Sequence, residues 1–154
     1  MNDRPDIGNR PVATWVRLAL VALAVPNLLT GLWALVDPQG WFDGFPGFDP
    51  RLVAAEPPFN EHLATDAGAG LLASGVVLLA AAWFADGRSV RLGLIAYGCF
   101  AIPHAAWHTV NPSEPLTAAE DVQNATTLLV AAIATIGLYV YVSRAAPGTT
   151  EVPA

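Results

Sequence analysis

Four long apolar segments, separated by short polar or proline- and glycine-rich stretches, dominate this sequence. They cover about residues 13–36, 63–84, 90–109 and 117–142. A helix needs about 20 residues, each adding about 1.5 Å, to cross the hydrocarbon core of a bilayer. Backbone polar groups in lipid must be hydrogen-bonded internally, so segments of this length predict transmembrane helices. We therefore predict an all-α integral membrane protein whose residues 11–143 form an up-down-up-down four-helix bundle.

The composition agrees with a membrane location and argues against some classes of partner. Hydrophobic residues make up 54% of the chain and charged residues 13%, whereas an ordinary soluble domain is about a quarter charged. Thirteen acidic residues outnumber seven basic ones, for a net charge of −6. Nucleic-acid binding requires a basic patch, so no nucleic-acid partner is expected. The expected surroundings are the lipid bilayer, with other membrane proteins or further copies of this chain as candidate partners.

Three polar or irregular segments complete the predicted organisation. Residues 1–10 and 144–154 are polar and are expected to be disordered tails. Residues 37–60 form a long loop that is rich in glycine, proline and aromatic residues. Because aromatic side chains favour the membrane interface, we expect this loop to lie across the mouth of the bundle, with a short helix near residues 51–55.

Charge is divided unequally between the two predicted sides of the membrane. Four spans place both termini on one side, and by the positive-inside rule the arginine-rich side is cytoplasmic. That side carries Arg4, Arg10, Arg17, Arg88, Arg91 and Arg144, whereas Arg51 is the only arginine opposite. The extracytoplasmic side collects all three histidines and nine of the thirteen acids: Asp37, Asp43, Asp49, Glu56, Glu61, Asp66, Glu114, Glu120 and Asp121.

Local motifs predict how the second and fourth spans begin and how the second packs. Asn60 precedes the second span after two prolines and is a candidate N-cap. The pattern Thr117-Ala118-Ala119-Glu120 is that of a capping box at the start of the fourth span. Small residues, which allow close approach of membrane helices, recur in the second span at Gly68, Gly70, Ser74 and Gly75.

The candidate site is at the extracytoplasmic ends of three spans. Residues four apart share a helix face, so His62 aligns with Asp66 on the second span and His104 with His108 on the third. Ionisable groups within a span are costly and normally face the bundle interior, where they are functional candidates. We therefore predict a polar pocket formed by these four residues, with supporting groups Glu61, Glu120, Asp121 and Asn124.

This grouping is compatible with several kinds of chemistry. Three imidazoles with one or two carboxylates suit a divalent Zn, Mn, Fe or Cu ion with an open position for water or substrate. The bound water could serve hydrolysis or hydration, a redox reaction is equally compatible, and whether the protein is an enzyme stays open. The alternative is a structural hydrogen-bond network in a non-catalytic accessory or scaffold subunit. A b-type haem would need two facing histidines, and the only obvious pair, His62 with His108, gives it little support.

The combined pattern also resembles a known group of proteins. Phe59-Asn60-Glu61-His62, Asp66-Ala67-Gly68, and then Pro103-His104 and His108 are similar to a group of small four-span membrane proteins of actinobacteria. In size and helix count these are broadly DoxX-like, and the resemblance covers roughly residues 20–140. It implies the four-helix fold and a bacterial cytoplasmic (plasma) membrane, with polar positions at His62, Asp66, His104 and His108, but it implies no reaction.

Overall fold

The computed structural model describes residues 11–144, which form five helices. These are α1 (Thr14–Val36), α2 (Pro38–Gly44), α3 (Glu61–Phe84), α4 (Gly87–Val110) and α5 (Ala118–Arg144). No strand occurs within residues 11–144, where the only β-type pairing is an isolated bridge between Pro11 and Asp86. The all-α prediction is therefore confirmed for this range. The tails expected at 1–10 and 144–154 lie outside it, except for Arg144.

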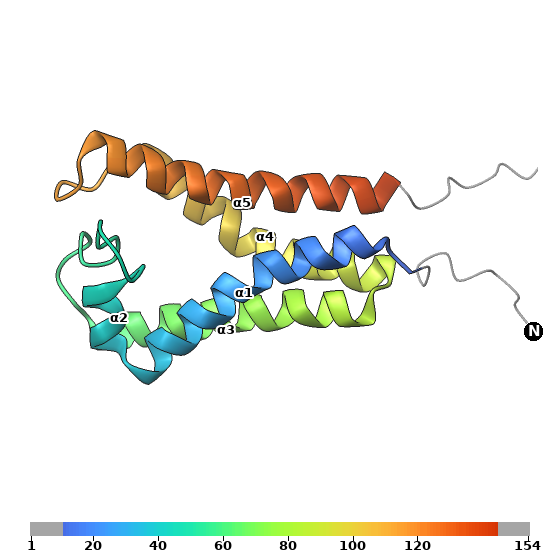
Figure 1. Ribbon diagram of the computed structural model, residues 1–154, viewed down its shortest axis with the longest axis horizontal. Helices are drawn as coiled ribbons and strands as arrows, with labels where there is room; N and C mark the ends of the chain where they lie inside the picture. Colours follow the sequence, from blue (N-terminus) through green and yellow to red (C-terminus); the bar gives the residue numbers. More distant parts are fainter. Residues whose placement is uncertain (1–10, 145–154) are drawn as a thin grey trace, which may run out of the picture.

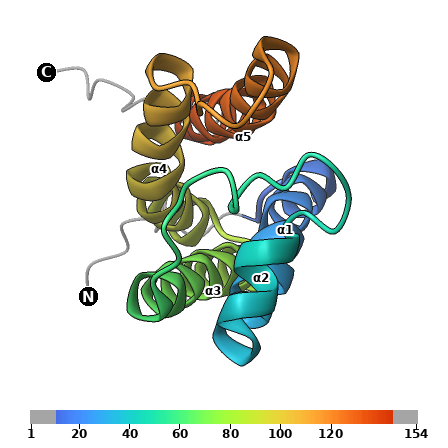
Figure 2. The same cartoon turned by 90° about the vertical axis from the view of Figure 1, so that its left-hand side faces the viewer.

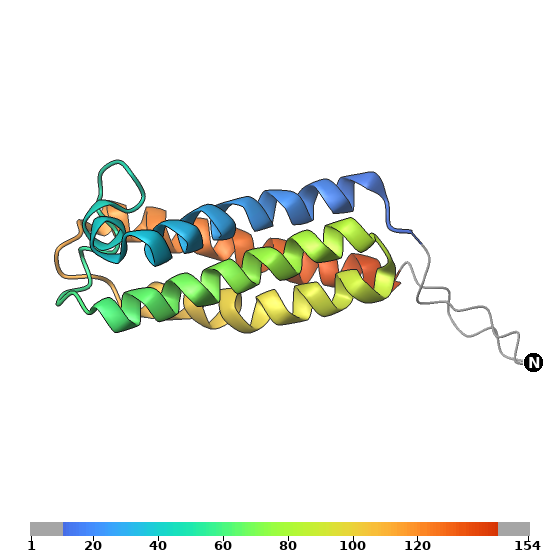
Figure 3. The ribbon, with the colours of Figure 1, turned by 90° about the horizontal axis from the view of Figure 1, so that it is seen from below.

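The four long helices lie side by side and alternate in direction (Figures 1 and 3). α1 begins and α5 ends at the same end of the molecule. The principal helix contacts are α1 with α3, α3 with α4 and α4 with α5, while the short α2 packs against α1 and α3. Each long helix therefore packs against the long helix that follows it in the chain. We refer below to the end where α1 begins as the inner end and to the opposite end as the outer end.

Three of the helices, α1, α3 and α5, are long and apolar enough to cross a membrane. Many of their large apolar side chains are exposed, including Leu18, Leu29 and Val130, as expected for surfaces that face lipid. The length and composition of these three helices confirm the prediction of a membrane protein with transmembrane helices. The third predicted span, about residues 90–109, corresponds to α4, which is as long as α3 but is not among the three. Arginines and histidines lower the hydropathy of α4.

The larger core cluster joins all four long helices, and its members on α1, α3 and α5 lie in their inner halves. Each helix contributes a stripe of buried residues to it. Leu20, Leu78 and Leu94 are its largest fully buried side chains. A second, smaller cluster at the outer end contains Ala34, Trp41 and Ala64. The molecule is therefore packed across all four helices toward the inner end, whereas the outer end is closed mainly around α1, α2 and α3.

Glycine allows α1 and α3 to pack closely. A Cβ atom on Gly31 would contact the backbone nitrogen of Leu72 and lie 2.8 Å from the carbonyl oxygen of Gly68. A Cβ on Gly75 would lie 2.6 Å from Leu28 Cγ. By contrast, a Cβ on Gly70 would meet nothing within 4 Å. The prediction of a small-residue contact face is correct for Gly68 and Gly75 and wrong for Gly70, which faces away from α1.

The predicted caps of α3 and α5 are confirmed. The side-chain oxygen of Asn60 accepts a hydrogen bond from the Leu63 amide at 3.1 Å. At the start of α5, the Thr117 amide donates to Glu120 Oε2 at 2.8 Å, and the Glu120 amide donates to Thr117 Oγ1 at 3.4 Å. This reciprocal pair is a capping box. Both caps satisfy amides that have no partner inside their helix.

The short helix of the outer loop lies at a different place from the one predicted. Residues 51–55 form turns, and the helix is instead α2. Asp37 accepts a hydrogen bond from the Gly40 amide at 2.9 Å, and Pro38 occupies the first turn. Aspartate at the N-cap followed by proline is a strong helix start. The sequence therefore contained a signal for α2 that the aromatic and glycine content of the loop obscured.

The turn between α3 and α4 is fixed by Asp86. Its carboxylate accepts hydrogen bonds from the amides of Arg88 and Ser89, both at 3.0 Å, and from the Ser89 hydroxyl at 2.6 Å. The bond from the Ser89 hydroxyl, followed by those from the backbone amides, lowers the pKa of Asp86 below its ordinary value. On the other side of the turn, the Val12 amide donates to the Ala85 carbonyl at 2.8 Å.

Replacing Asp86 with alanine should lower the free energy of unfolding by about 1 kcal/mol at neutral pH, the usual value of an N-cap. Because the folded state lowers the pKa of this carboxyl, its contribution is complete above the unfolded pKa of about 3.9 and is lost as the pH falls through the folded value. Unfolding in mixed micelles at pH 7 and at acidic pH measures both effects. The exposed Glu114→Ala is the control; a deficit for Asp86→Ala that persists unchanged in acid would contradict this account.

Candidate functional site

The residues predicted to form the site lie on the parts of α3, α4 and α5 at the outer end of the molecule. There α4 and α5 lie to one side of α1, α2 and α3, and the segment 45–60 runs between the two groups (Figure 2). The Ser113 hydroxyl, in the connection from α4 to α5, donates a hydrogen bond to the Ala55 carbonyl at 2.7 Å. The loop that joins α2 to α3 is thereby also attached to the connection between α4 and α5.

Pro103 precedes His104 within α4. Proline has no amide hydrogen to donate to the carbonyl four residues earlier, that of Cys99, and its ring pushes that carbonyl away. A helix bends at such a position. The last two turns of α4, which carry His104 and His108, therefore follow a direction set partly by Pro103.

His104 and His108 belong to a column of rings along one face of α4. The imidazole of His104 stacks on Phe100, with 5.0 Å between ring centroids and 20° between planes. His108 meets His104 edge to face at 4.9 Å and 84°. Both imidazoles are partly buried. The column continues inward to the buried Tyr97, whose centroid lies 6.4 Å from that of Phe100.

Tyr97 connects this column to α1 through Asn27. The Asn27 amide donates to the Tyr97 hydroxyl at 3.4 Å and to the Leu23 carbonyl at 2.8 Å. Both residues are buried. This pair was not predicted as part of the site, although the sequence contains two signals for it: an asparagine in the middle of a span, and a tyrosine seven residues before His104 on the same helix face.

His62 and Asp66 form a separate pair on the first turns of α3. His62 Nε2 lies 3.4 Å from Asp66 Oδ2, and the two side chains are 83% and 63% exposed. The predicted i, i+4 alignment is therefore present. With this exposure, the pair is largely open to its surroundings, unlike the partly buried histidines of α4.

Two of the four supporting groups form hydrogen bonds at the start of α5. Glu120 belongs to the capping box of α5, and Asp121 accepts a hydrogen bond from the Ser113 amide at 3.1 Å. Glu61 is exposed in the first turn of α3, and Asn124 is partly exposed on α5. The two acids of α5 thus have structural roles in stabilising the connection from α4 to α5.

The predicted ligands lie in two pairs. Within residues 11–144, no group of three or more histidine, cysteine, aspartate or glutamate side chains is placed to hold a metal ion. The helical spacing aligned His62 with Asp66 and His104 with His108 as expected. The residues best arranged for a shared ligand are His104 and His108, because their rings are adjacent and partly shielded.

No protein-family model, curated protein or solved structure matches the chain. The resemblance to the actinobacterial four-span group stays a prediction.

Proposed function

We propose that this chain is a four-span protein of the bacterial plasma membrane that binds one divalent transition-metal ion through His104 and His108 at its extracytoplasmic end. The observation that carries the proposal is the adjacency of the two imidazoles, whose centroids are 4.9 Å apart on one face of α4. Histidines at i and i+4 are the spacing with which helices bind zinc. Imidazole also suits copper and iron, and among divalent ions copper and zinc bind such ligands strongly.

The proposed topology follows from the direction of the helices. α3 and α5 both run from the outer to the inner end, and both are apolar enough to cross a membrane. If both cross, the segment between them must return across the membrane, which supports α4 as the remaining span. The positive-inside rule then favours a cytoplasmic inner end, because Arg17, Arg88, Arg91 and Arg144 belong to residues near that end.

A metal ion coordinated by only two histidines would keep open coordination positions for water or another ligand, as catalytic metal sites do. Neutral imidazoles are the metal-binding form, and the rings of His104 and His108 are both partly buried. Tyr97 and Phe100 would hold the imidazole column in place from its inner side. This arrangement supports binding by α4 alone, with His62 and Asp66 outside the coordination sphere.

The test is the metal content of protein purified in detergent without chelators. We expect near-stoichiometric metal in the wild type and in the matched control His62→Ala/Asp66→Ala, and almost none in His104→Ala/His108→Ala. Loss of metal in both double variants would instead support the four-residue pocket predicted from the sequence. A metal-free wild type would reject metal binding and favour the alternative, an accessory subunit in which these groups are structural.

The accessory alternative has one observation in its favour. Gly70 lies on the surface of α3 with open space around it, and small residues of this kind let another membrane helix approach closely. Metal content separates the two candidates, because an accessory subunit does not need a metal ion for its contacts.

A further inference from the structure

Residues 45–60, which we call the strap, connect α2 to α3 across the outer end of the molecule (Figure 2). On the side of α1, α2 and α3 the strap is held by several apolar side chains. Phe45, Val53 and Phe59 pack against the smaller core cluster. Phe59 also meets Phe42 of α2 edge to face, with 5.2 Å between ring centroids. This side of the strap is therefore anchored by hydrophobic packing at several points.

The attachment of the strap to α4 and α5 is of a different kind. Within residues 11–144, a single hydrogen bond joins the strap to this side, from Ser113 Oγ to the Ala55 carbonyl at 2.7 Å. Ser113 is itself held in place, because its amide donates to Asp121 Oδ1 at 3.1 Å and its carbonyl accepts from the Leu116 amide at 3.0 Å. Loss of one hydrogen bond between neutral groups shifts an equilibrium by about fivefold. This attachment is therefore easily reversed.

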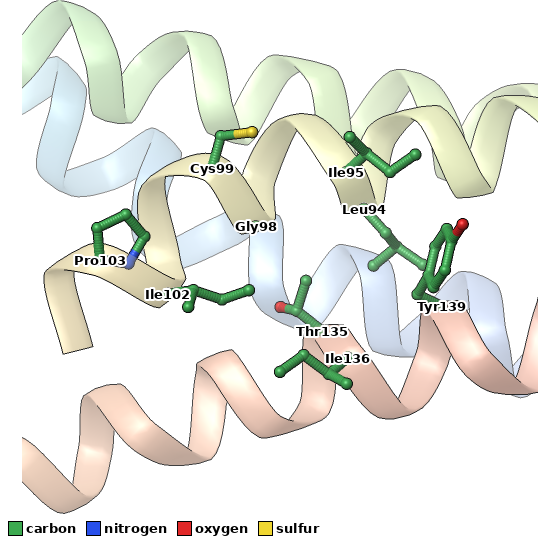
Figure 4. A pocket seen from close by; sticks show the side chains of 9 residues that line it. All are labelled: Leu94, Ile95, Gly98, Cys99, Ile102, Pro103, Thr135, Ile136 and Tyr139. Carbon is green, nitrogen blue, oxygen red and sulfur yellow. The ribbon is translucent and has the colours of Figure 1, made fainter. Parts of the chain in front are cut away.

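His104 and His108 lie on the face of α4 that points into the bundle. They share this face with Tyr97, whose hydroxyl accepts a hydrogen bond from Asn27 of α1 at 3.4 Å. The opposite face of α4, which includes Cys99, lines an apolar groove with α5 (Figure 4). The two imidazoles are therefore on the interior side of α4, turned away from that groove.

The strap lies outward of both histidines. α3 and α4 run in opposite directions, and their register is set where a Cβ on Gly93 would lie 2.8 Å from Ala81 Cβ. Counting equal numbers of residues from this pair places His108 about level with Asp66, and His104 one turn deeper. The strap ends where α3 begins, five residues before Asp66, or about 8 Å further out along the helix.

The interior of the bundle is less tightly filled at the outer end than at the inner end. One face of α5, with residues spaced three and four apart, runs from Asn124 through Leu128 to Thr135, Leu138 and Val142. The last three are buried, whereas Asn124 and Leu128 are only partly buried although they continue the same core-facing stripe. Access to the interior side of α4 is therefore easiest from the outer end, across which the strap runs.

We infer that the strap is a cover over His104 and His108, and that the hydrogen bond from Ser113 to Ala55 is its latch. When this bond breaks, the strap moves on its anchored side and solutes at the outer end reach the two imidazoles. The inference concerns access to these histidines, and it holds whether or not they bind a metal ion.

Diethyl pyrocarbonate, which acylates neutral imidazoles, measures access to each histidine when the modified residues are identified by mass spectrometry. The full chain in detergent would be treated as purified and again after exposure to a chelator, which removes shielding by any bound metal ion. In the chelator-treated wild type, His62 should react fastest because it is 83% exposed. Ser113→Ala should raise the rates at His104 and His108 about fivefold and leave the rate at His62 unchanged.

Two further variants are controls for the latch. Ser113→Thr keeps a hydroxyl and should react as the wild type does. Ser74→Ala removes a hydroxyl that donates to a carbonyl of its own helix at 2.8 Å, and it should also match the wild type. Equal rates at His104 and His108 in the wild type and Ser113→Ala would overturn the latch. An equal rise at His62 would show general loosening of the fold and would also count against it.

Metal content tests the proposed function separately from the strap. Metal-free wild-type protein would reject metal binding, while the rates of histidine modification would still decide whether the strap covers His104 and His108. Conversely, stoichiometric metal together with unchanged rates in Ser113→Ala would reject the latch and leave the metal site standing.

Discussion

Replacing Gly31 with alanine should separate α1 from α3 and lower the free energy of unfolding by about 3 kcal/mol, near the upper end for overpacking. The added Cβ would meet the Leu72 nitrogen and lie 2.8 Å from the Gly68 oxygen. Both are backbone atoms, so no rotamer change can relieve the contact and the helices themselves must move. Unfolding in mixed micelles, followed by far-ultraviolet circular dichroism, would measure the loss.

Gly70→Ala is the matched control for Gly31→Ala. It makes the same chemical change on α3, but the new Cβ would meet nothing within 4 Å. Alanine is also the better helix former by up to about 1 kcal/mol, so the control should be neutral or stabilising. Equal destabilisation by the two substitutions would show that helix propensity or another local effect, rather than the α1–α3 contact, determines the result.

Replacing Leu78 with alanine should lower the free energy of unfolding by about 2 kcal/mol, at the low end for buried leucine. Leu78 is fully buried in the core cluster that joins the four long helices. In a membrane protein the unfolded side chain is surrounded by lipid, which is as apolar as leucine. The cost therefore comes mainly from the cavity left behind and from lost packing contacts rather than from transfer to water.

The neighbouring Leu79 is the matched control for Leu78, since it lies on the same helix and is 44% exposed. Leu79→Ala should change the unfolding free energy by less than about 0.5 kcal/mol, as surface substitutions usually do. Mixed-micelle unfolding of both variants gives the comparison. A similar loss in both would mean that the face of α3 containing Leu79 is packed against a partner protein in the sample.

The caps of the helices could be predicted from the sequence because they are local. Asn60 and the Thr117–Glu120 capping box form hydrogen bonds that span only three residues. Such contacts depend on residue type and spacing, with little influence from distant parts of the chain. Asp37 and Pro38 form the same kind of local signal at the start of α2.

The packing of α3 could not be predicted from its small residues alone. The spacing of the small residues in α3 places them at different angles around the helix axis, so they do not share one narrow face. These residues are Gly68, Gly70, Ser74 and Gly75. Which of them meet another helix depends on the rotation of α3 about its axis. The contact with α1 fixes that rotation, so Gly68 and Gly75 are covered while Gly70 faces outward.

For the candidate site, the sequence by itself determined the two i, i+4 pairs, because helical periodicity aligns such residues. It also determined that the chain is helical and suited to a membrane, because long apolar segments leave few alternatives. Only the tertiary structure decided that His104 and His108 form a partly buried column with Phe100 while His62 and Asp66 remain exposed. The physical reason is that spacing fixes which residues share a face, whereas the direction of that face depends on contacts between helices distant in the chain.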